Sequence, residues 1–283
     1  MKSLAYYEQL FTLKSMLLPG GEKVVYREAN PHAKKTIVVV HGITGTHYSM
    51  LQMAGPWAER GARVIMPDLP GHGGSDRIAV KRFNEIADWL HVVIKKFDID
   101  GPFTLVGNSF GSAVCFSYIC LNDLPDGSRV VLGAPTPTIS LLSTRLEQAS
   151  KLFPEWMLNH WYYRNRLVEW IRMKVLLADM KNDMLRDRLR ESLRSEAKVV
   201  QHKYAMTLTG LMAHDRPFSQ KLRSPEIQDH IYVVFGDKDK IAGPDVAEQM
   251  RAILPHAIML RAKNCGHLVH IEATASLDVA VDI

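Results

Sequence analysis

Phe103-Thr-Leu-Val-Gly-Asn-Ser-Phe-Gly-Ser112 is the stretch of this 283-residue sequence that decides its fold. The apolar residues 103–106 predict a buried strand, and the apolar run over residues 112–120 predicts a buried helix. Only five residues are left to turn the chain between them, so the middle one, Ser109, has to adopt a strained backbone conformation. Side chains at the two flanking positions would collide with the neighbouring strand and helix, which explains the two glycines. A plain Gly/Ser turn would fit the same pattern, so the rest of the chain has to decide between the two interpretations.

Patterns of buried strands recur on both sides of this stretch, at residues 35–40, 62–67, 128–132, 230–235 and 257–260. Apolar residues at helical spacing lie between them, as in residues 83–97. Residues 12–18 and 22–28 flank Pro19-Gly-Gly21 and predict an antiparallel hairpin. The alternation of strands and helices predicts an α/β fold with a mostly parallel central sheet flanked by helices.

The strand pattern is absent from residues 136–216, where Leu185, Leu189 and Leu193 recur at every fourth position. We therefore expect a core domain of residues 1–135 and 217–283 and an inserted helical cap of residues 136–216. Residues 145–223 contain sixteen Lys or Arg and nine Asp or Glu, which we interpret as a solvated helical face rather than a site for anions. Basic and aromatic residues do not interleave as they do in nucleic-acid-binding proteins, so no such partner is expected.

The bulk composition is ordinary for a globular protein, with 47% hydrophobic and 23% charged residues. No apolar run reaches the roughly 18 residues of a membrane span. Glu8 and Gln9 interrupt the apolar core that a signal peptide would need. Cys115, Cys120 and Cys265 are too few and too irregularly spaced for a disulfide framework. We therefore expect a cytoplasmic protein without stable membrane insertion; its oligomeric state is not predicted.

Polar residues follow two of the later strand patterns. Asp237 and Asp239 come directly after residues 230–235, and His267 follows residues 257–260. Each is expected at the same carboxyl edge of the sheet as Ser109. A serine hydroxyl becomes a good nucleophile when a base lies within hydrogen-bond distance and a carboxylate holds that base. The order Ser, Asp, His along the chain is that of enzymes with a nucleophile elbow at the turn between strand and helix.

Other reactive side chains near His267 are interpreted as structural. Cys265 is expected to fill a loop as a small side chain. His270 and Glu272 are expected to be solvated helix residues, because no complete set of metal ligands accompanies them. No metal and no cofactor is therefore predicted.

The chain resembles α/β-hydrolase fold proteins that carry a helical cap, over essentially its whole length. The resemblance rests, in chain order, on His41-Gly42, Asp68-Leu-Pro-Gly-His-Gly-Gly-Ser75, Gly107-Asn-Ser-Phe-Gly111, Gly236-Asp-Lys-Asp239 and Gly266-His267. It implies a catalytic triad of Ser109, Asp239 and His267, with Asp237 as the competing acid. It also implies an oxyanion hole formed by the backbone N–H groups of Ile43 and Phe110. In this family His41, His72 and Asp76 are expected to be architectural.

The resemblance implies a serine hydrolase that cleaves an ester, thioester or lactone of a small molecule through an acyl-enzyme. We hypothesise that cap side chains such as Trp156 and Trp161 contact an apolar acyl group. One alternative is carbon–carbon bond hydrolysis, because the elbow resembles that of meta-cleavage product hydrolases, although Leu268 stands where those enzymes generally have Trp. A second alternative is a ligand-binding protein of the same fold without catalysis, which the three filled triad positions disfavour. Epoxide hydrolases and haloalkane dehalogenases need a carboxylate where this chain has Ser109.

Overall fold

A computed structural model of the chain describes residues 2–137, 152–196 and 199–282. In these residues an eight-stranded sheet has the order β1-β2-β4-β3-β5-β6-β7-β8. The strands are β1 (Thr12–Leu17), β2 (Lys23–Ala29), β3 (Thr36–Val40), β4 (Arg63–Pro67), β5 (Phe103–Asn108), β6 (Arg129–Gly133), β7 (Ile231–Gly236) and β8 (Ile258–Ala262). Strand β2 is antiparallel to β1 and β4, and the pairings from β4 across to β8 are parallel.

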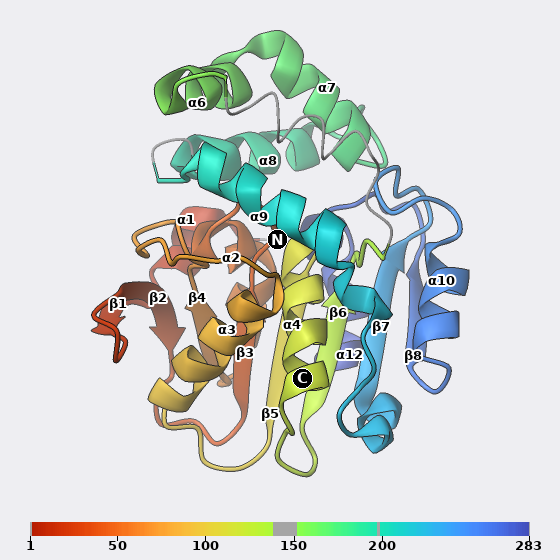
Figure 1. The fold of residues 1–283 in the computed structure, drawn as a ribbon. Helices are drawn as coiled ribbons and strands as arrows, with labels where there is room; N and C mark the ends of the chain where they lie inside the picture. The colour runs from red at the N-terminus through yellow and green to blue at the C-terminus, as the bar shows by residue number, and fades with distance from the viewer. Residues whose placement is uncertain (1, 138–151, 197–198, 283) are drawn as a thin grey trace.

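Helices cover both faces of the sheet (Figure 1). The helices of the core are α1 (Leu4–Glu8), α2 (His47–Glu59), α3 (Asn84–Lys96), α4 (Phe110–Leu121), α10 (Val246–Ile253), α11 (Val269–Glu272) and α12 (Thr274–Val281). Strand β3 shows why the sheet needs cover on two sides. Its Val38 and Val40 belong to an apolar cluster with α3 and α4, while Ile37 and Val39 belong to a second cluster with α2 and α12. All four side chains are at most 1% exposed, as expected for a strand buried on both faces.

Between β6 and β7 the described chain forms helices that lie over the carboxyl ends of the parallel strands (Figure 1). They are α6 (Glu155–Arg164), α7 (Arg166–Leu176), α8 (Asp183–Glu196) and α9 (His202–Asp215). In α8, Leu189 and Leu193 are buried and Leu185 is half-buried, so the spacing of four identified the inward face of this helix. Residues 138–151 of the predicted cap lie outside the described residues.

The predicted fold class, the hairpin and the strands are confirmed, with strand ends shifted by one or two residues. Strand β8 differs from the predicted buried strand: it lies at the edge of the sheet, and of its residues only Ala262 is buried. The short helix α1 was not predicted, nor were the two 3₁₀ segments Pro217–Ser219 and Pro225–His230. Elements of this length have too little periodicity to be detected in a sequence.

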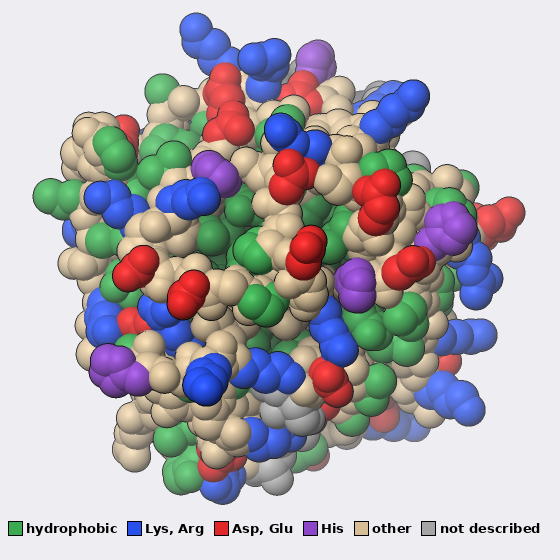
Figure 2. All heavy atoms as spheres, turned by 90° about the horizontal axis from the view of Figure 1, so that it is seen from below, with side chains coloured by type: hydrophobic (Ala, Val, Ile, Leu, Met, Phe, Trp, Pro, Cys, Tyr) green, Lys and Arg blue, Asp and Glu red, His purple; other side chains and the backbone are tan. Residues whose placement is uncertain are grey.

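The surface at the amino ends of the parallel strands intermingles basic and acidic side chains, with small apolar patches between them (Figure 2). In the described part of the chain, every helix is too short or too polar to cross a lipid bilayer.

Candidate active site

Ser109 lies at the turn between the last residue of β5 and the first residue of α4. Its φ of 53° and ψ of −114° are strained for a residue with a side chain, as predicted. A Cβ atom at Gly107 would lie 2.3 Å from the carbonyl oxygen of Gly111, and one at Gly111 would lie 2.2 Å from that of Val40. Both glycines are therefore required by the close approach of backbone segments, and the turn presents the Ser109 side chain at the sheet edge.

His267 connects Ser109 to Asp239. His267 Nε2 lies 2.8 Å from Ser109 Oγ, and His267 Nδ1 lies 2.8 Å from Asp239 Oδ2. The imidazole and the carboxylate are both largely buried. Because a carboxylate only accepts hydrogen bonds, Nδ1 carries the proton and Nε2 is left to accept from the serine hydroxyl. Three side chains from the ends of β5, β7 and β8 are thus hydrogen-bonded in series.

Asp239 is held in its ionised form. Burial disfavours the charge, but the hydrogen bond from His267 and two backbone N–H groups outweigh it, so the pKa of Asp239 lies below its usual value. Those N–H groups belong to Ile241 and Ala242 and donate to Oδ1 at 2.8 and 3.0 Å. Asp237 points elsewhere: its Oδ1 accepts from the N–H of Cys265 at 3.3 Å. The structure therefore brings Asp239, rather than Asp237, to His267.

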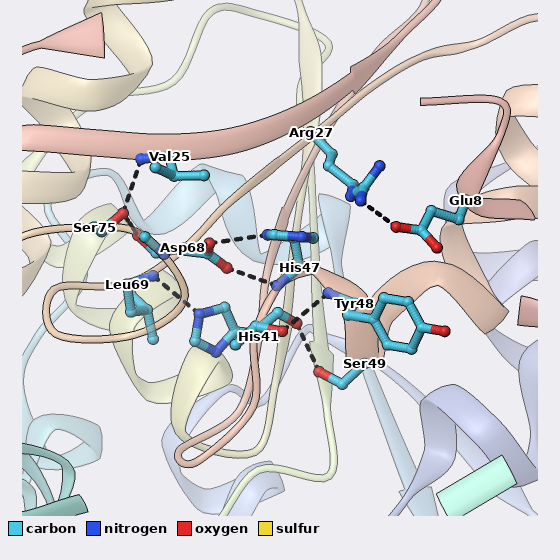
Figure 3. A network of polar contacts seen from close by, with 12 residues as sticks. Glu8, Val25, Arg27, His41, His47, Tyr48, Ser49, Asp68, Leu69 and Ser75 are labelled. Atoms are coloured by element: carbon cyan, nitrogen blue, oxygen red, sulfur yellow. Dashed lines mark hydrogen bonds and ion pairs between the residues drawn. The ribbon is translucent and has the colours of Figure 1, made fainter. Parts of the chain in front are cut away.

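The loop after β3 is held against the turn by His41. The buried ring donates from Nδ1 to the carbonyl of Gly42 at 2.8 Å. It accepts at Nε2 from the N–H of Leu69 at 2.9 Å (Figure 3). Burial lowers the pKa of His41 to about 3, so the ring is neutral and can do both. Gly42 packs on Ser109, with 3.5 Å between its ideal Cβ position and Ser109 Cβ. The N–H of Ile43 follows directly, and the N–H of Phe110 is the first of α4 and has no acceptor within that helix.

The loop of residues 68–76 is a scaffold for the same region. Asp68 accepts from the backbone N–H of His47 at 2.8 Å and from its Nδ1 at 2.9 Å (Figure 3). Ser75 Oγ donates to the Asp68 carbonyl and accepts from the backbone of β2. His72 and Asp76 make hydrogen bonds to backbone groups as well. These contacts agree with an architectural role for the loop.

The two tryptophans predicted to contact an acyl group, Trp156 and Trp161, both lie on α6. Trp156 is 71% exposed and Trp161 is 54% exposed. Their neighbour Tyr162 instead reaches the loop after β3, where its hydroxyl lies 3.3 Å from Thr44 Oγ. Adjacent residues on a helix point about 100° apart, so a one-residue difference selects another face.

An apolar cluster fills the space between cap and core. It includes Met173 and Leu177 of the α7 region together with Leu268, the residue after His267. A cleft of about 920 Å³ opens between α7 and α8, and its wall contains Met173 and Met180 of this cluster. The cleft therefore borders the apolar cluster, and most of its other lining residues are charged.

The prediction that His270 and Glu272 are solvated is wrong. His270 is 4% exposed, and Glu272 is half-buried with its carboxylate hydrogen-bonded to backbone. Among the described residues, no group of three or more His, Cys, Asp or Glu side chains is arranged to hold a metal ion. Cys265 is fully buried, and burial raises the pKa of its thiol, which leaves it a poor nucleophile.

Comparison with known proteins finds a family and several relatives for this chain. A family model described as alpha/beta hydrolase fold matches residues 35–274. Lipase 3 of Moraxella sp. (strain TA144) is 22% identical over 275 residues, which cover 92% of this chain and 80% of the lipase. Lipase 1 of Psychrobacter immobilis is 23% identical over 279 residues with the same coverage. The solved structure of a thermophilic esterase from Thermogutta terrifontis superimposes with a TM-score of 0.73 at 17% identity, covering 96% of this chain and 97% of the esterase.

The close approach at the turn makes a prediction about stability. Replacing Gly111 by Ala should lower the free energy of unfolding by about 1–3 kcal/mol or more, because the added methyl group overlaps the backbone of β3. Gly42→Ala is the matched control, since its nearest neighbour would be at an ordinary 3.4 Å. Urea unfolding measures both. Equal losses in the two variants would contradict the packing argument.

The buried His270 makes a prediction about pH. Burial, reinforced by the nearby His267, lowers its pKa from 6.5 to about 3. The unfolded chain therefore binds more protons than the folded chain between these values, and the stability contributed by neutral His270 is lost as pH falls through that window. The free energy of unfolding should fall by up to about 1.4 kcal/mol per pH unit for this group. A His270→Met variant should show a shallower slope in urea titrations from about pH 7 to pH 5; an unchanged slope would show that the ring titrates normally.

Proposed function

The chain belongs to the alpha/beta hydrolase fold family, and within it we propose that it is a serine hydrolase that cleaves carboxylic esters through an acyl-enzyme. The observation that carries the proposal is the series of hydrogen bonds from Asp239 through His267 to Ser109. This arrangement provides a nucleophile, a base within reach of its proton, and a carboxylate that fixes the tautomer of the base.

In the proposed first half-reaction, Ser109 Oγ attacks the ester carbonyl carbon while His267 Nε2 takes the hydroxyl proton. Asp239 stabilises the imidazolium that forms, without accepting its proton. The tetrahedral intermediate expels the alkoxide, which His267 protonates, and the acyl group remains on Ser109. In the second half, His267 takes a proton from water, the hydroxide attacks the acyl carbon, and Ser109 leaves with the proton.

The negative charge of the tetrahedral intermediate needs hydrogen-bond donors that are already in position. We propose the backbone N–H groups of Ile43 and Phe110 for this role. The neutral ring of His41 supports the role of the Ile43 N–H, because it binds the preceding carbonyl of Gly42 and links it to Leu69. The start of α4 supports the second, because its first N–H groups have no acceptor in the helix.

The substrate is proposed to have a small to medium apolar acyl group. An apolar cluster that contains Leu268 adjoins His267. Its partly buried members Ile43 and Tyr162 offer such a group a contact surface. We propose that residues 136–216 act as a cap over a core of residues 1–135 and 217–283, with Tyr162 at its contact with the Thr44 loop. The names of the relatives, lipases and an esterase, support ester hydrolysis over the alternatives. Thioesters and lactones are substrates of the same chemistry.

The nucleophile assignment predicts the effect of one substitution. Ser109→Ala should abolish covalent labelling by a fluorophosphonate and reduce hydrolysis of short p-nitrophenyl esters to background. Mass spectrometry of the labelled peptide and a spectrophotometric assay measure the two effects. The exposed Ser219→Ala is the matched control and should behave as the wild type. Residual labelling of Ser109→Ala at the wild-type rate would assign the nucleophile elsewhere.

The acid assignment predicts a ranking. Asp239→Asn should lower kcat by on the order of 10³–10⁴, because an amide can present its NH₂ group to Nδ1 and favour the wrong tautomer. Asp237→Asn should change kcat by less than about tenfold, since Asp237 contacts the loop backbone rather than the imidazole. Steady-state assays of the purified variants compare them. A larger loss in Asp237→Asn would reverse the assignment.

The substrate class is tested by a panel of esters, thioesters, lactones and dienone acids. The proposal expects the highest kcat/KM for an ester or thioester. Faster cleavage of a dienone acid would instead favour carbon–carbon bond hydrolysis.

A further inference from the structure

The last turn of α7 is bonded to the two loops that carry His267 and Asp239. Helix α7 ends at Leu176, so its final carbonyl groups need partners outside the helix. The ammonium of Lys240, the residue after Asp239, donates to the carbonyl of Lys174 at 2.6 Å. The backbone N–H of His267 itself donates to the carbonyl of Leu176 at 2.9 Å. A helix of the cap therefore depends on the loops of the active site for its C-terminal capping.

Glu272 bridges the same two segments from the other side. Its Oε2 accepts from the N–H of Ala178, two residues beyond α7, at 2.9 Å. Its Oε1 accepts from the N–H of Gly266, the residue before His267, at 3.1 Å. Burial raises the pKa of Glu272, and the N–H donors act against that effect by stabilising the ionised form. Hydrogen bonds of this kind are about twice as strong when the acceptor is charged.

The two segments are also in direct backbone contact. A Cβ atom at Gly266 would lie 2.4 Å from the carbonyl oxygen of Leu176 and 2.7 Å from the nitrogen of Ala178. Residues 174–178 and 266–272, which we call the α7 joint, are thus packed without room for a side chain between them. A displacement of the end of α7 would move the backbone of His267 or break these bonds.

We infer that Glu272 is a positioning residue: it locks the end of α7 to the loop that carries His267, and so keeps the imidazole within hydrogen-bond distance of Ser109 while the cap is docked. This inference rests on the proposed function. It adds that the docked helix α7 controls the position of the His267 imidazole. The physical reason is the short distance of 2.8 Å between His267 Nε2 and Ser109 Oγ, because a shift of about 1 Å would break this hydrogen bond. A misplacement of that size costs up to about 10²-fold in rate.

Two substitutions break the bridge between Ala178 and Gly266 from opposite sides. Glu272→Gln keeps the size of the side chain but turns one of its two acceptor oxygens into an NH₂ group, so it can accept from Ala178 or from Gly266 but not from both. Ala178→Pro removes the N–H donor from the cap. The preceding Leu177, with φ −92° and ψ 145°, already has the extended conformation that a following proline favours. Glu248→Gln, an exposed residue on α10, is the matched control.

Each of the two variants should lower kcat on a short p-nitrophenyl ester by about tenfold and leave KM within about twofold. Labelling of Ser109 by a small fluorophosphonate should slow by a similar factor. The double variant should be no slower than the slower single variant, because both remove one interaction. Glu248→Gln alone should have the kcat of the wild type. Combined with Ala178→Pro, it should have the kcat of Ala178→Pro alone.

A purely structural role predicts another pattern: a lower melting temperature with wild-type labelling rates in the folded variants, and that result would overturn the inference. Losses that multiply to about 100-fold in the double variant would overturn it too. If Ala178→Pro does not fold, the labelling rate of Glu272→Gln and hydrogen exchange at the amides of Ala178 and Gly266 test the inference. Unchanged protection of both amides in Glu272→Gln would contradict the bridge. Wild-type protein without Ser109-dependent labelling would remove the proposed function itself, whereas labelled wild type with an unaffected Glu272→Gln would remove only this inference.

Discussion

The structure depends on the close contact between backbone segments, with no side chain between them, at the turn between β5 and α4. Gly107 and Gly111 let the strand end, the turn and the helix start lie within van der Waals contact of one another and of β3. That contact forces Ser109 to a φ of 53°, a conformation that the surrounding sheet must stabilise. The N–H of Ser109 is held by the carbonyl of Gly133 at 2.8 Å, so the neighbouring strand β6 helps to fix it. The position of one hydroxyl group is thereby determined by the central strands of the sheet.

The other groups of the site are arranged around this turn by loops at the same sheet edge. Each loop is fixed by hydrogen bonds to backbone rather than by surface ion pairs, which contribute little. The ring of His41 links the carbonyl of Gly42, next to Ile43, to the N–H of Leu69 in the loop of residues 68–76. The carboxylate of Asp239 accepts from two backbone N–H groups. The α7 joint adds the cap to this set. In this view the end of α7 is part of the support of the proposed base.

The candidate site residues could be predicted because each follows a strand in the parallel part of the sheet. Parallel strands place their carboxyl ends at one edge, so Ser109, Asp239 and His267 were expected to meet although they are far apart in the chain. The cap was harder, since α6 and α7 have little core to pack on and their inward faces leave a weak pattern. The contact of Tyr162 with Thr44 could therefore not be predicted from the sequence. Glu272 and His270 looked like solvated helix residues because nothing local signals burial. Glu272 is bonded to Ala178, a residue about ninety positions earlier in the chain, just beyond the end of α7.

The most direct measurement of the central claim is a crystal structure of the protein after reaction with a small phosphonylating inhibitor. The account predicts a covalent bond from Ser109 Oγ to phosphorus, the phosphoryl oxygen within about 3 Å of the N–H groups of Ile43 and Phe110, and His267 still bonded to Asp239. An adduct on another residue, or a phosphoryl oxygen directed away from both N–H groups, would contradict it.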